Sequence, residues 1–167
     1  DINSLVEAAV DIKVLELDFK ITSGLILEGL DLYENPALSL ELVEKLVPAF
    51  PSLKELRARI SSPDPVPDDI FWGWYDLKRL HLFGSDQSPK FVRVLLSNLS
   101  SLSELVISAT SLDVQTAAAF GRCPELKRLR LSGIRQSSTF IKALIPNLPS
   151  FVEELEINAV KFSDTEA

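Results

Sequence analysis

The sequence predicts an α/β fold, a right-handed solenoid in which a parallel sheet forms the concave side and helices form the convex side. Two observations predict it. A short apolar frame recurs at a nearly constant step, and segments with helical spacing of apolar residues lie between successive frames. One strand–helix unit cannot bury its apolar residues alone, whereas stacked units bury them against each other. Parallel strands joined by helices wind in a right-handed sense.

The recurring frame is apolar-x-x-apolar-x-apolar. Its copies are Leu53-x-x-Leu56-x-Ala58, Leu77-x-x-Leu80-x-Leu82, Leu102-x-x-Leu105-x-Ile107, Leu126-x-x-Leu129-x-Leu131 and Val152-x-x-Leu155-x-Ile157. Their first residues stand at 53, 77, 102, 126 and 152, which gives steps of 24, 25, 24 and 26 residues. A step this regular indicates one architecture throughout, so we expect a single domain over 1–167 with about six to seven units.

The N-terminal part fits this pattern less well. Residues 1–10 indicate the end of a helix, and the alternation over 14–19 is typical of a strand. A second frame begins at Leu27, only 15 residues after a frame that begins at Ile12, and this step is too short for a parallel crossover through a helix. Either this unit lacks its helix, or residues 14–19 form a hairpin with the next strand. We assign the second frame to the repeat and leave the first open.

From Leu30 onward, strands and helices are expected to alternate. The expected helices cover 39–50, 89–99, 113–120 and 137–148, and Ser39 is the N-cap of the first. The expected strands centre on 56–58, 80–82, 105–107, 129–131 and 155–157. Residues 61–69 contain three prolines and three aspartates, which predicts an extended loop before a short turn at 70–74. Residues 164–167 are expected to fray.

Composition excludes several classes of protein. The chain has 167 residues, of which 46% are hydrophobic and 25% charged, as in ordinary soluble domains. A net charge of −7 argues against binding to a nucleic-acid backbone. No apolar run is long enough to span a membrane, and the N-terminus does not resemble a signal peptide. The chain begins at Asp1 and contains no methionine, so we expect it to be a fragment of a longer protein.

The sequence does not indicate an enzyme. His81 is the only histidine and Cys123 the only cysteine, so neither a catalytic triad nor a zinc site of usual composition forms within the chain. Asp64, Asp68 and Asp69 suggest a metal site in one interpretation, but their alternation with proline fits a solvated loop more simply. We expect no activity, metal or cofactor. Cys123 is expected to be a small buried residue, and a lone cysteine fits a reducing compartment.

The residues between the frame leucines are the best candidates for binding, because in a strand they point to the opposite side of the sheet. Arginines and aromatic residues commonly anchor interfaces, and arginine suits an acidic or phosphorylated peptide. The predicted partner-binding residues on this face are Arg57, Arg59, Arg79, His81, Phe83, Arg128 and Arg130. In the alternative, Glu55, Glu104 and Glu154 pair laterally with Arg57, Arg79 and Arg128, which leaves a solvated and self-neutralised face.

The segment Phe71-Trp72-Gly73-Trp74-Tyr75 is a second candidate. Its aromatic residues either replace a missing helix and fill the core, which is the favoured interpretation, or expose a tryptophan as an interface anchor. Trp72 and Trp74 are therefore included among the predicted partner-binding residues.

The full frame L-x-x-L-x-L-x-x-N resembles the leucine-rich repeat, and Leu27, Leu30, Leu32 and Asn35 match it completely. In that family the ninth position supplies an amide that bonds neighbouring turns. Here the later units hold Ser61, Ser85, Thr110, Ile134 and Val160 at this position. The resemblance implies that the three hydroxyls do part of this work, whereas Ile134 and Val160 do not.

The stretch C-P-E-L-K-R-L-R-L over 123–131, with the P-S-L and P-S-F leads at Pro51 and Pro149, resembles the repeats of F-box/leucine-rich-repeat substrate receptors of ubiquitin ligases. This resemblance implies a cytoplasmic or nuclear protein that binds a substrate through the concave face and delivers it for ubiquitination. The expected partner is a protein or an acidic or phosphorylated peptide, not nucleic acid or a membrane. The alternative is a structural scaffold segment that packs against other repeats or domains of its own longer chain.

Overall fold

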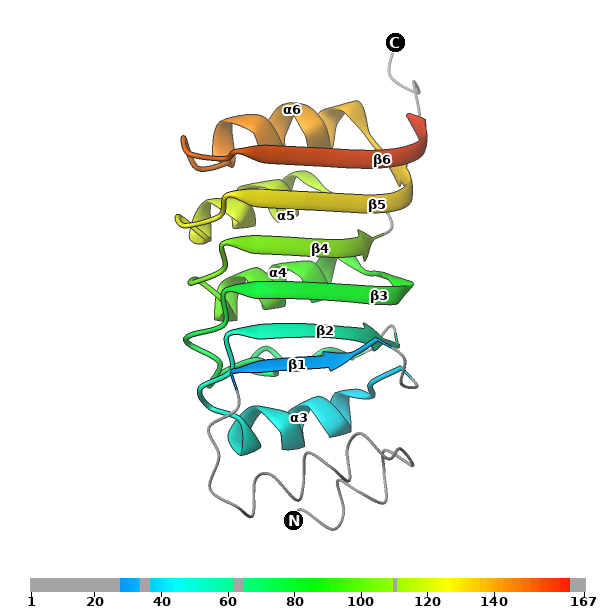
Figure 1. Ribbon diagram of the computed structural model, residues 1–167. Coiled ribbons are helices and arrows are strands. Elements are labelled where there is room, and N and C mark those ends of the chain that lie inside the picture. Colours follow the sequence, from blue (N-terminus) through cyan, green and yellow to red (C-terminus); the bar gives the residue numbers. More distant parts are fainter. Residues whose placement is uncertain (1–27, 34–36, 62–64, 110, 163–167) are drawn as a thin grey trace.

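The protein forms a mixed α/β structure around one open sheet of six parallel strands. The computed structural model describes residues 28–33, 37–61, 65–109 and 111–162. The strands lie in chain order, β1 to β6, each beside the next (Figure 1). Their bounds are Gly29–Leu32 for β1, Glu55–Ile60 for β2, Arg79–Gln87 for β3, Glu104–Ala109 for β4, Arg128–Gln136 for β5 and Glu154–Phe162 for β6. The prediction of an α/β fold with a parallel sheet is confirmed.

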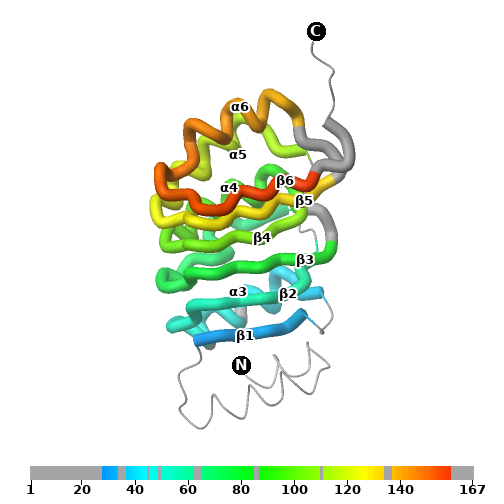
Figure 2. Tube along the Cα trace, turned by 45° about the horizontal axis from the view of Figure 1, so that its top comes forward, coloured from blue at the N-terminus to red at the C-terminus, as the bar shows by residue number. Residues whose placement is uncertain are grey.

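Helices cover one face of the sheet and leave the other open (Figure 2). They are α3 at Leu40–Ala49, α4 at Pro89–Asn98, α5 at Val114–Ala119 with the 3-10 turn η1 at Phe120–Arg122, and α6 at Ser138–Asn147. Each α-helix begins after a side chain that accepts a hydrogen bond from a backbone N–H of its first turn. These N-caps are Ser39, Ser88, Asp113 and Ser137. The predicted helices are confirmed with shifts of one residue at most ends, as expected from local capping signals.

The apolar frames stack in register through the sheet. Leu80 lies opposite Leu56 on one side and opposite Leu105 on the other, and Leu129 continues the row to Leu155. The backbone before each strand repeats one arrangement: a carbonyl oxygen accepts two N–H groups from the next unit. The accepting residues are Glu28, Lys54, Lys78, Ser103 and Lys127. The near-constant step in the sequence is therefore the step of one strand across the sheet.

The core lies between the sheet and the helices. Leu53, Leu77, Leu102 and Leu126 begin their frames fully buried, and the second and third frame residues of β2 to β5 are buried beside them. In each of the five units, the first N–H of the frame donates a hydrogen bond to the carbonyl three residues before it. The accepting residues are Phe50, Trp74, Leu99, Cys123 and Pro149. The prediction that Cys123 is buried is confirmed, and burial raises the pKa of its thiol to about 11.

The connection between β2 and β3 differs from the others, because its described part, residues 65–78, forms turns without a helix. Phe71 and Trp74 take the place of the helix in the core and stack with ring centroids 6.2 Å apart. Trp74 also donates a hydrogen bond from Nε1 to the Phe50 carbonyl, at 3.1 Å. The interpretation of this segment as a core plug is confirmed for these two rings.

Two sets of predictions lie partly outside the described residues. The helix at 1–10, the strand at 14–19 and the frame that begins at Ile12 fall there, as do Asn35 and the fraying end at 164–167. Of the ninth-position residues, Ser61 is described. Its hydroxyl donates a hydrogen bond to the Leu38 carbonyl of the preceding unit at 3.1 Å.

Candidate functional site

The candidate site is the open face of the sheet, formed by side chains that alternate with the buried leucines. Alternation is strict in β2, where Glu55, Arg57 and Arg59 are exposed and their neighbours are buried. The register places the side chains in three rows across the strands. Row one holds Gly29, Glu55, Arg79, Glu104, Arg128 and Glu154; row two holds Asp31, Arg57, His81, Val106, Arg130 and Glu156. Row three holds Tyr33, Arg59, Phe83, Ser108, Ser132 and Asn158. It is interrupted between Phe83 and Ser108, because the register of β3 against β4 shifts after Leu82.

In the β1–β3 half of this face, arginines lie against aromatic rings. The Arg57 guanidinium lies 4.5 Å from the ring centroid of Tyr33 and 5.5 Å from that of Phe83. Arg59 lies 5.0 Å from the same Tyr33 ring. The Tyr33 and Phe83 rings meet edge to face at 5.0 Å. These cation–π contacts position both guanidinium groups. Arg57 also lies 3.7 Å from a carboxylate oxygen of Asp31.

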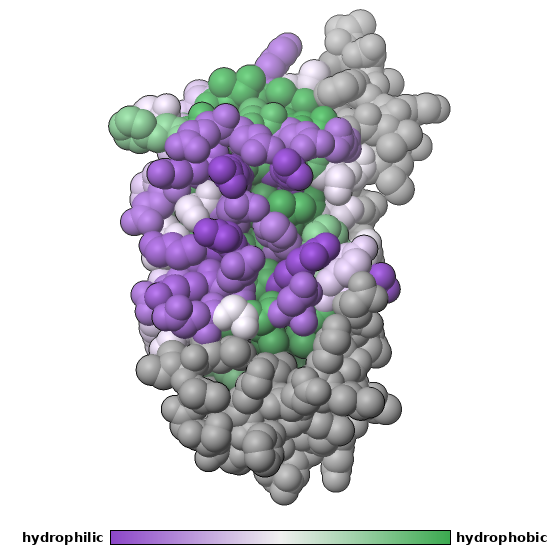
Figure 3. Space-filling view, viewed as in Figure 1, coloured by the Kyte–Doolittle hydropathy of each residue, from purple (hydrophilic) through white to green (hydrophobic). Residues whose placement is uncertain are grey.

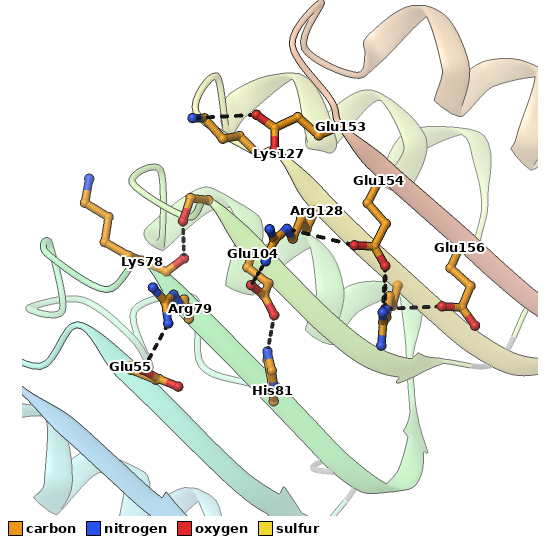
Figure 4. Close-up of polar contacts among 12 residues, drawn as sticks. Glu55, Lys78, Arg79, His81, Glu104, Lys127, Arg128, Glu153, Glu154 and Glu156 are labelled. Carbon is orange, nitrogen blue, oxygen red and sulfur yellow. Dashed lines mark hydrogen bonds and ion pairs between the residues drawn. The ribbon is translucent and has the colours of Figure 1, made fainter.

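The middle of the face carries short polar contacts between strands, shown in Figure 4. Nε2 of His81 lies 2.7 Å from a carboxylate oxygen of Glu104, and both side chains are half-buried. Arg79 reaches Glu55 of the preceding strand at 3.5 Å. Because Glu104 also lies 3.6 Å from Arg128, one carboxylate serves both neighbouring strands.

In the β4–β6 half, the arginines are occupied by carboxylates. Arg130 contacts Glu154 at 2.6 Å and Glu156 at 3.2 Å, and Arg128 contacts Glu104 and, at 3.9 Å, Glu154 (Figure 4). The hydrogen bond from Arg130 holds the pKa of Glu154 below its ordinary value, and the same bond raises the pKa of Arg130. These side chains are mutually satisfied, as the lateral-pairing alternative predicts.

A hollow of about 490 Å³ lies on the open face. Arg57, His81, Phe83 and Arg130 from the predicted set line it, together with Asp31, Glu55, Glu104 and the apolar Val106. Seen in space-filling form, the face is largely hydrophilic (Figure 3). The hollow is therefore a shallow polar depression in which acidic and basic groups alternate.

Rows one and two mix both signs of charge, whereas row three does not. Among the described residues of row three, Arg59 is the only charged side chain, and the others are aromatic, hydroxyl or amide. Arg59 forms no ion pair with any residue that the structure describes. The unpaired positive charge of row three therefore lies on β2, at Arg59, beside the rings of Tyr33 and Phe83.

Most predicted site residues come together. Arg57, Arg59, His81 and Phe83 form one neighbourhood, and Arg79 borders it. Arg128 and Arg130 lie farther along the sheet in the ion-pair network. Tyr33 joins the site but was not among the predicted site residues. Its place in row three beside Arg59 and Phe83 was the signal that could have identified it.

Trp72 and Trp74 lie in different environments. Trp74 is fully buried, so its prediction as a partner-binding residue is wrong, because an interior ring cannot contact a partner. Trp72 is 66% exposed and borders a different hollow, of about 450 Å³, beside Val47, Pro48 and Pro51 at the end of α3. It does not join the arginines of the open face.

The described residues offer little for metal or nucleophilic chemistry. Asp68 and Asp69 are exposed turn residues, and Asp64 lies outside the described part. No cluster of three or more metal-ligating side chains occurs in the described ranges. The Cys123 thiol lies 3.4 Å from the Leu99 carbonyl oxygen in the core, and its raised pKa disfavours a thiolate nucleophile. Within the same ranges, no helix has the length and apolar character needed to cross a membrane.

In comparisons with known proteins, no family model and no curated protein matches this chain. The candidate function therefore follows from the residues and their geometry.

Proposed function

We propose that the chain is a right-handed leucine-rich-repeat solenoid that recognises a protein partner through the open, concave face of its sheet. The constant step, the in-register frames and the repeated carbonyl that accepts two N–H groups support the repeat assignment. The C-P-E-L-K-R-L-R-L stretch supports the substrate-binding part of an F-box ubiquitin-ligase receptor as its most specific form. A place in the cytoplasm or nucleus and the absence of enzyme activity belong to the same proposal.

The observation that carries the binding proposal is the arrangement of Arg57 and Arg59 around Tyr33 and Phe83. The rings hold both guanidinium groups in place, so less side-chain freedom is lost when a ligand binds. Arg59 lies in the row that lacks described carboxylates, whereas the other two rows already hold acids. An acidic or phosphorylated segment of a protein fits there, because arginine binds such groups through paired charge-assisted hydrogen bonds.

The experiment compares two double variants with equal charge change on the same face. Arg57→Gln with Arg59→Gln removes the ring-held pair, and Arg128→Gln with Arg130→Gln is the matched control. Binding of fluorescent phosphoserine, aspartate-containing and neutral peptides is measured by anisotropy. The first variant is expected to weaken binding of the phosphopeptide about tenfold or more, because hydrogen bonds to charged groups contribute about 1.5–3 kcal/mol each. The control is expected to change it about twofold at most, since its arginines are already paired.

Equal loss in both variants would show that net charge alone attracts the peptide and would overturn the assignment to Arg57 and Arg59. No binding of any acidic peptide by the unaltered protein would overturn the ligand class. Circular dichroism of each variant establishes that the fold is retained.

The second candidate function is the scaffold, in which the chain packs against other repeats or domains of a longer protein. One observation favours it: large apolar side chains are exposed at the β6 end of the molecule, including Phe151 and Leu155. This candidate predicts that isolated 1–167 binds none of the peptides and associates instead through that end.

A further inference from the structure

The β6 end of the molecule exposes positions that are buried in every other described unit. Leu155 is 41% exposed, whereas Leu129, Leu105 and Leu80 at the same frame position are 0% exposed. Ile157 and Val152 are only partly buried, although Leu131 and Leu126 at their positions are buried. In space-filling form, hydrophobic residues gather at this end over α6 and β6 (Figure 3). An apolar surface of this kind is typical of an interface.

Two further large apolar side chains of the last described unit are exposed. Phe151 is 79% exposed, whereas the four preceding units hold polar residues at its place: Ser52, Asp76, Ser101 and Glu125. On α6, Ile145 is 61% exposed.

The backbone of β6 also offers unused hydrogen-bonding groups. Each carbonyl from Glu28 to Lys127 in the repeated arrangement accepts two N–H groups from the next unit. The equivalent carbonyl of Glu153 receives none from the described residues. Among those residues, β6 pairs only with β5, so its other edge is open for a further strand. Such an edge is a template for strand addition.

The charges on β6 indicate the kind of strand that would complete this edge. Row one alternates in sign from Glu55 through Arg79, Glu104 and Arg128 to Glu154. In row two, Arg130 is followed by Glu156, and Lys127 lies 3.9 Å from Glu153 before the strand. Opposite charges on adjacent strands stabilise pairing and like charges oppose it. The next strand therefore requires basic residues beside Glu153, Glu154 and Glu156, and apolar residues beside Leu155 and Ile157.

We propose that β6 and α6 form a docking edge for a polypeptide segment that adds a parallel strand of alternating basic and apolar residues. Its N–H groups bond to the Glu153 carbonyl, its basic side chains pair with the glutamates, and its apolar residues cover Leu155 and Ile157. A second copy of this chain is a poor occupant for this edge. Two β6 strands paired by a two-fold axis bring two sets of glutamates onto one face, and like charges oppose that pairing.

The chain contains a natural probe for this edge, because β5 and α6 already form the unit that precedes β6. A fluorescent peptide that copies residues 126–148 presents Lys127, Arg128 and Arg130 between its leucines. The matched control peptide carries Lys127→Glu, Arg128→Glu and Arg130→Glu with the apolar residues unchanged. A third peptide carries N-methyl groups on the backbone nitrogens of Lys127 and Arg128, which are the two donors to the equivalent carbonyl in the folded chain.

Binding to the whole 1–167 chain is measured by anisotropy, with oligomeric state followed by light scattering. The basic peptide is expected to bind at least about tenfold more tightly than the glutamate and N-methylated peptides. Glu154→Gln with Glu156→Gln is expected to bring the ratio of basic to glutamate peptide close to one while circular dichroism shows an unchanged fold. Leu155→Ser is expected to weaken binding of the basic peptide. Arg57→Gln with Arg59→Gln is expected to leave that binding unchanged, which separates this edge from the open-face site.

Three outcomes would overturn the proposal. Equal binding of the basic and glutamate peptides would show that pairing with the β6 glutamates does not select the segment. Full binding of the N-methylated peptide would show that the segment does not add as a strand. Self-association of the chain that Leu155→Ser abolishes and the basic peptide fails to compete with would assign the edge to a second copy.

Discussion

The β1–β3 and β4–β6 halves of the open face share one leucine frame but use their arginines differently. In the first half, Arg57 and Arg59 lie over the rings of Tyr33 and Phe83. In the second, Arg128 and Arg130 are bound by Glu104, Glu154 and Glu156. An arginine that lies over a ring keeps its hydrogen-bond donors free for a ligand, whereas Arg130 already donates to Glu154 and its charge is balanced by two carboxylates. The two halves therefore differ in their capacity to bind an anion.

The halves also differ behind the sheet. Between β2 and β3 the described connection has turns with Phe71 and Trp74 as a plug, whereas helices follow β3, β4 and β5. Trp74 and Cys123 occupy the same position of their units, and both lie within hydrogen-bonding reach of a carbonyl of the preceding unit. The same backbone turn thus accommodates a very large and a very small side chain.

The largest expected effect tests this difference in the core. Trp74→Ala is expected to lower the free energy of unfolding by about 3–5 kcal/mol, because it removes a buried ring from a connection with no described helix to close the gap. Cys123→Ala at the equivalent position is expected to cost about 1 kcal/mol or less, since little volume is lost. Urea unfolding of both variants measures the contrast. Similar losses would mean that the plug is not what stabilises the first half.

A smaller effect is expected at the helix N-caps, where the halves again differ in chemistry. Ser39→Ala before α3 and Asp113→Ala before α5 are each expected to cost about 0.5–2 kcal/mol. Partial burial opposes ionisation of Asp113, but hydrogen bonds from Thr116 and Arg93 outweigh it and hold its pKa below the ordinary value.

Because the pKa of Asp113 is lowered on folding, its stabilisation is present above the unfolded-state pKa and is lost as pH falls through the folded-state value. The cost of Asp113→Ala is therefore expected to shrink below about pH 4, whereas the cost of Ser39→Ala stays constant. Thermal unfolding between pH 7 and pH 2.5 measures both. A cost of Asp113→Ala that does not vary with pH would contradict the role of its charge.

The smallest effect concerns the two kinds of arginine. Arg130→Gln is expected to lower the unfolding temperature at low salt and to do so less in 1 M NaCl, because ion pairs between exposed groups are screened. The change in unfolding temperature caused by Arg57→Gln is expected to depend less on salt, since the main described contacts of Arg57 are ring faces. Lys142→Gln on the exposed side of α6 is the control and is expected to change neither the unfolding temperature nor its dependence on salt. A larger salt dependence for Arg57→Gln would mean that Asp31, at 3.7 Å, is its main partner.

Much of the fold was predictable because its signals are local. Ser39 and the other caps satisfy the first N–H groups of their own helices, and the alternation in Glu55–Ile60 sets which side chains are buried. The constant step between frames also fixed the register, so Arg79 and Glu104 were expected on neighbouring strands. Residues 61–69 were predicted to form a loop without a helix because their prolines prevent a regular helix.

The sequence by itself determined the frame, the caps, the alternation of strand and helix, and the list of side chains on the open face. Tertiary structure decided which of those side chains are available. Arg57 and Arg130 occupy the same row, yet only their neighbours from strands more than twenty residues away make one ring-held and the other paired with acids. It also decided that Trp74 is buried and Trp72 exposed, and that Leu155 is uncovered. Local sequence patterns specify where the side chains point and how far apart they lie along the chain. Whether a side chain is available to a partner depends on contacts that form only when the units stack.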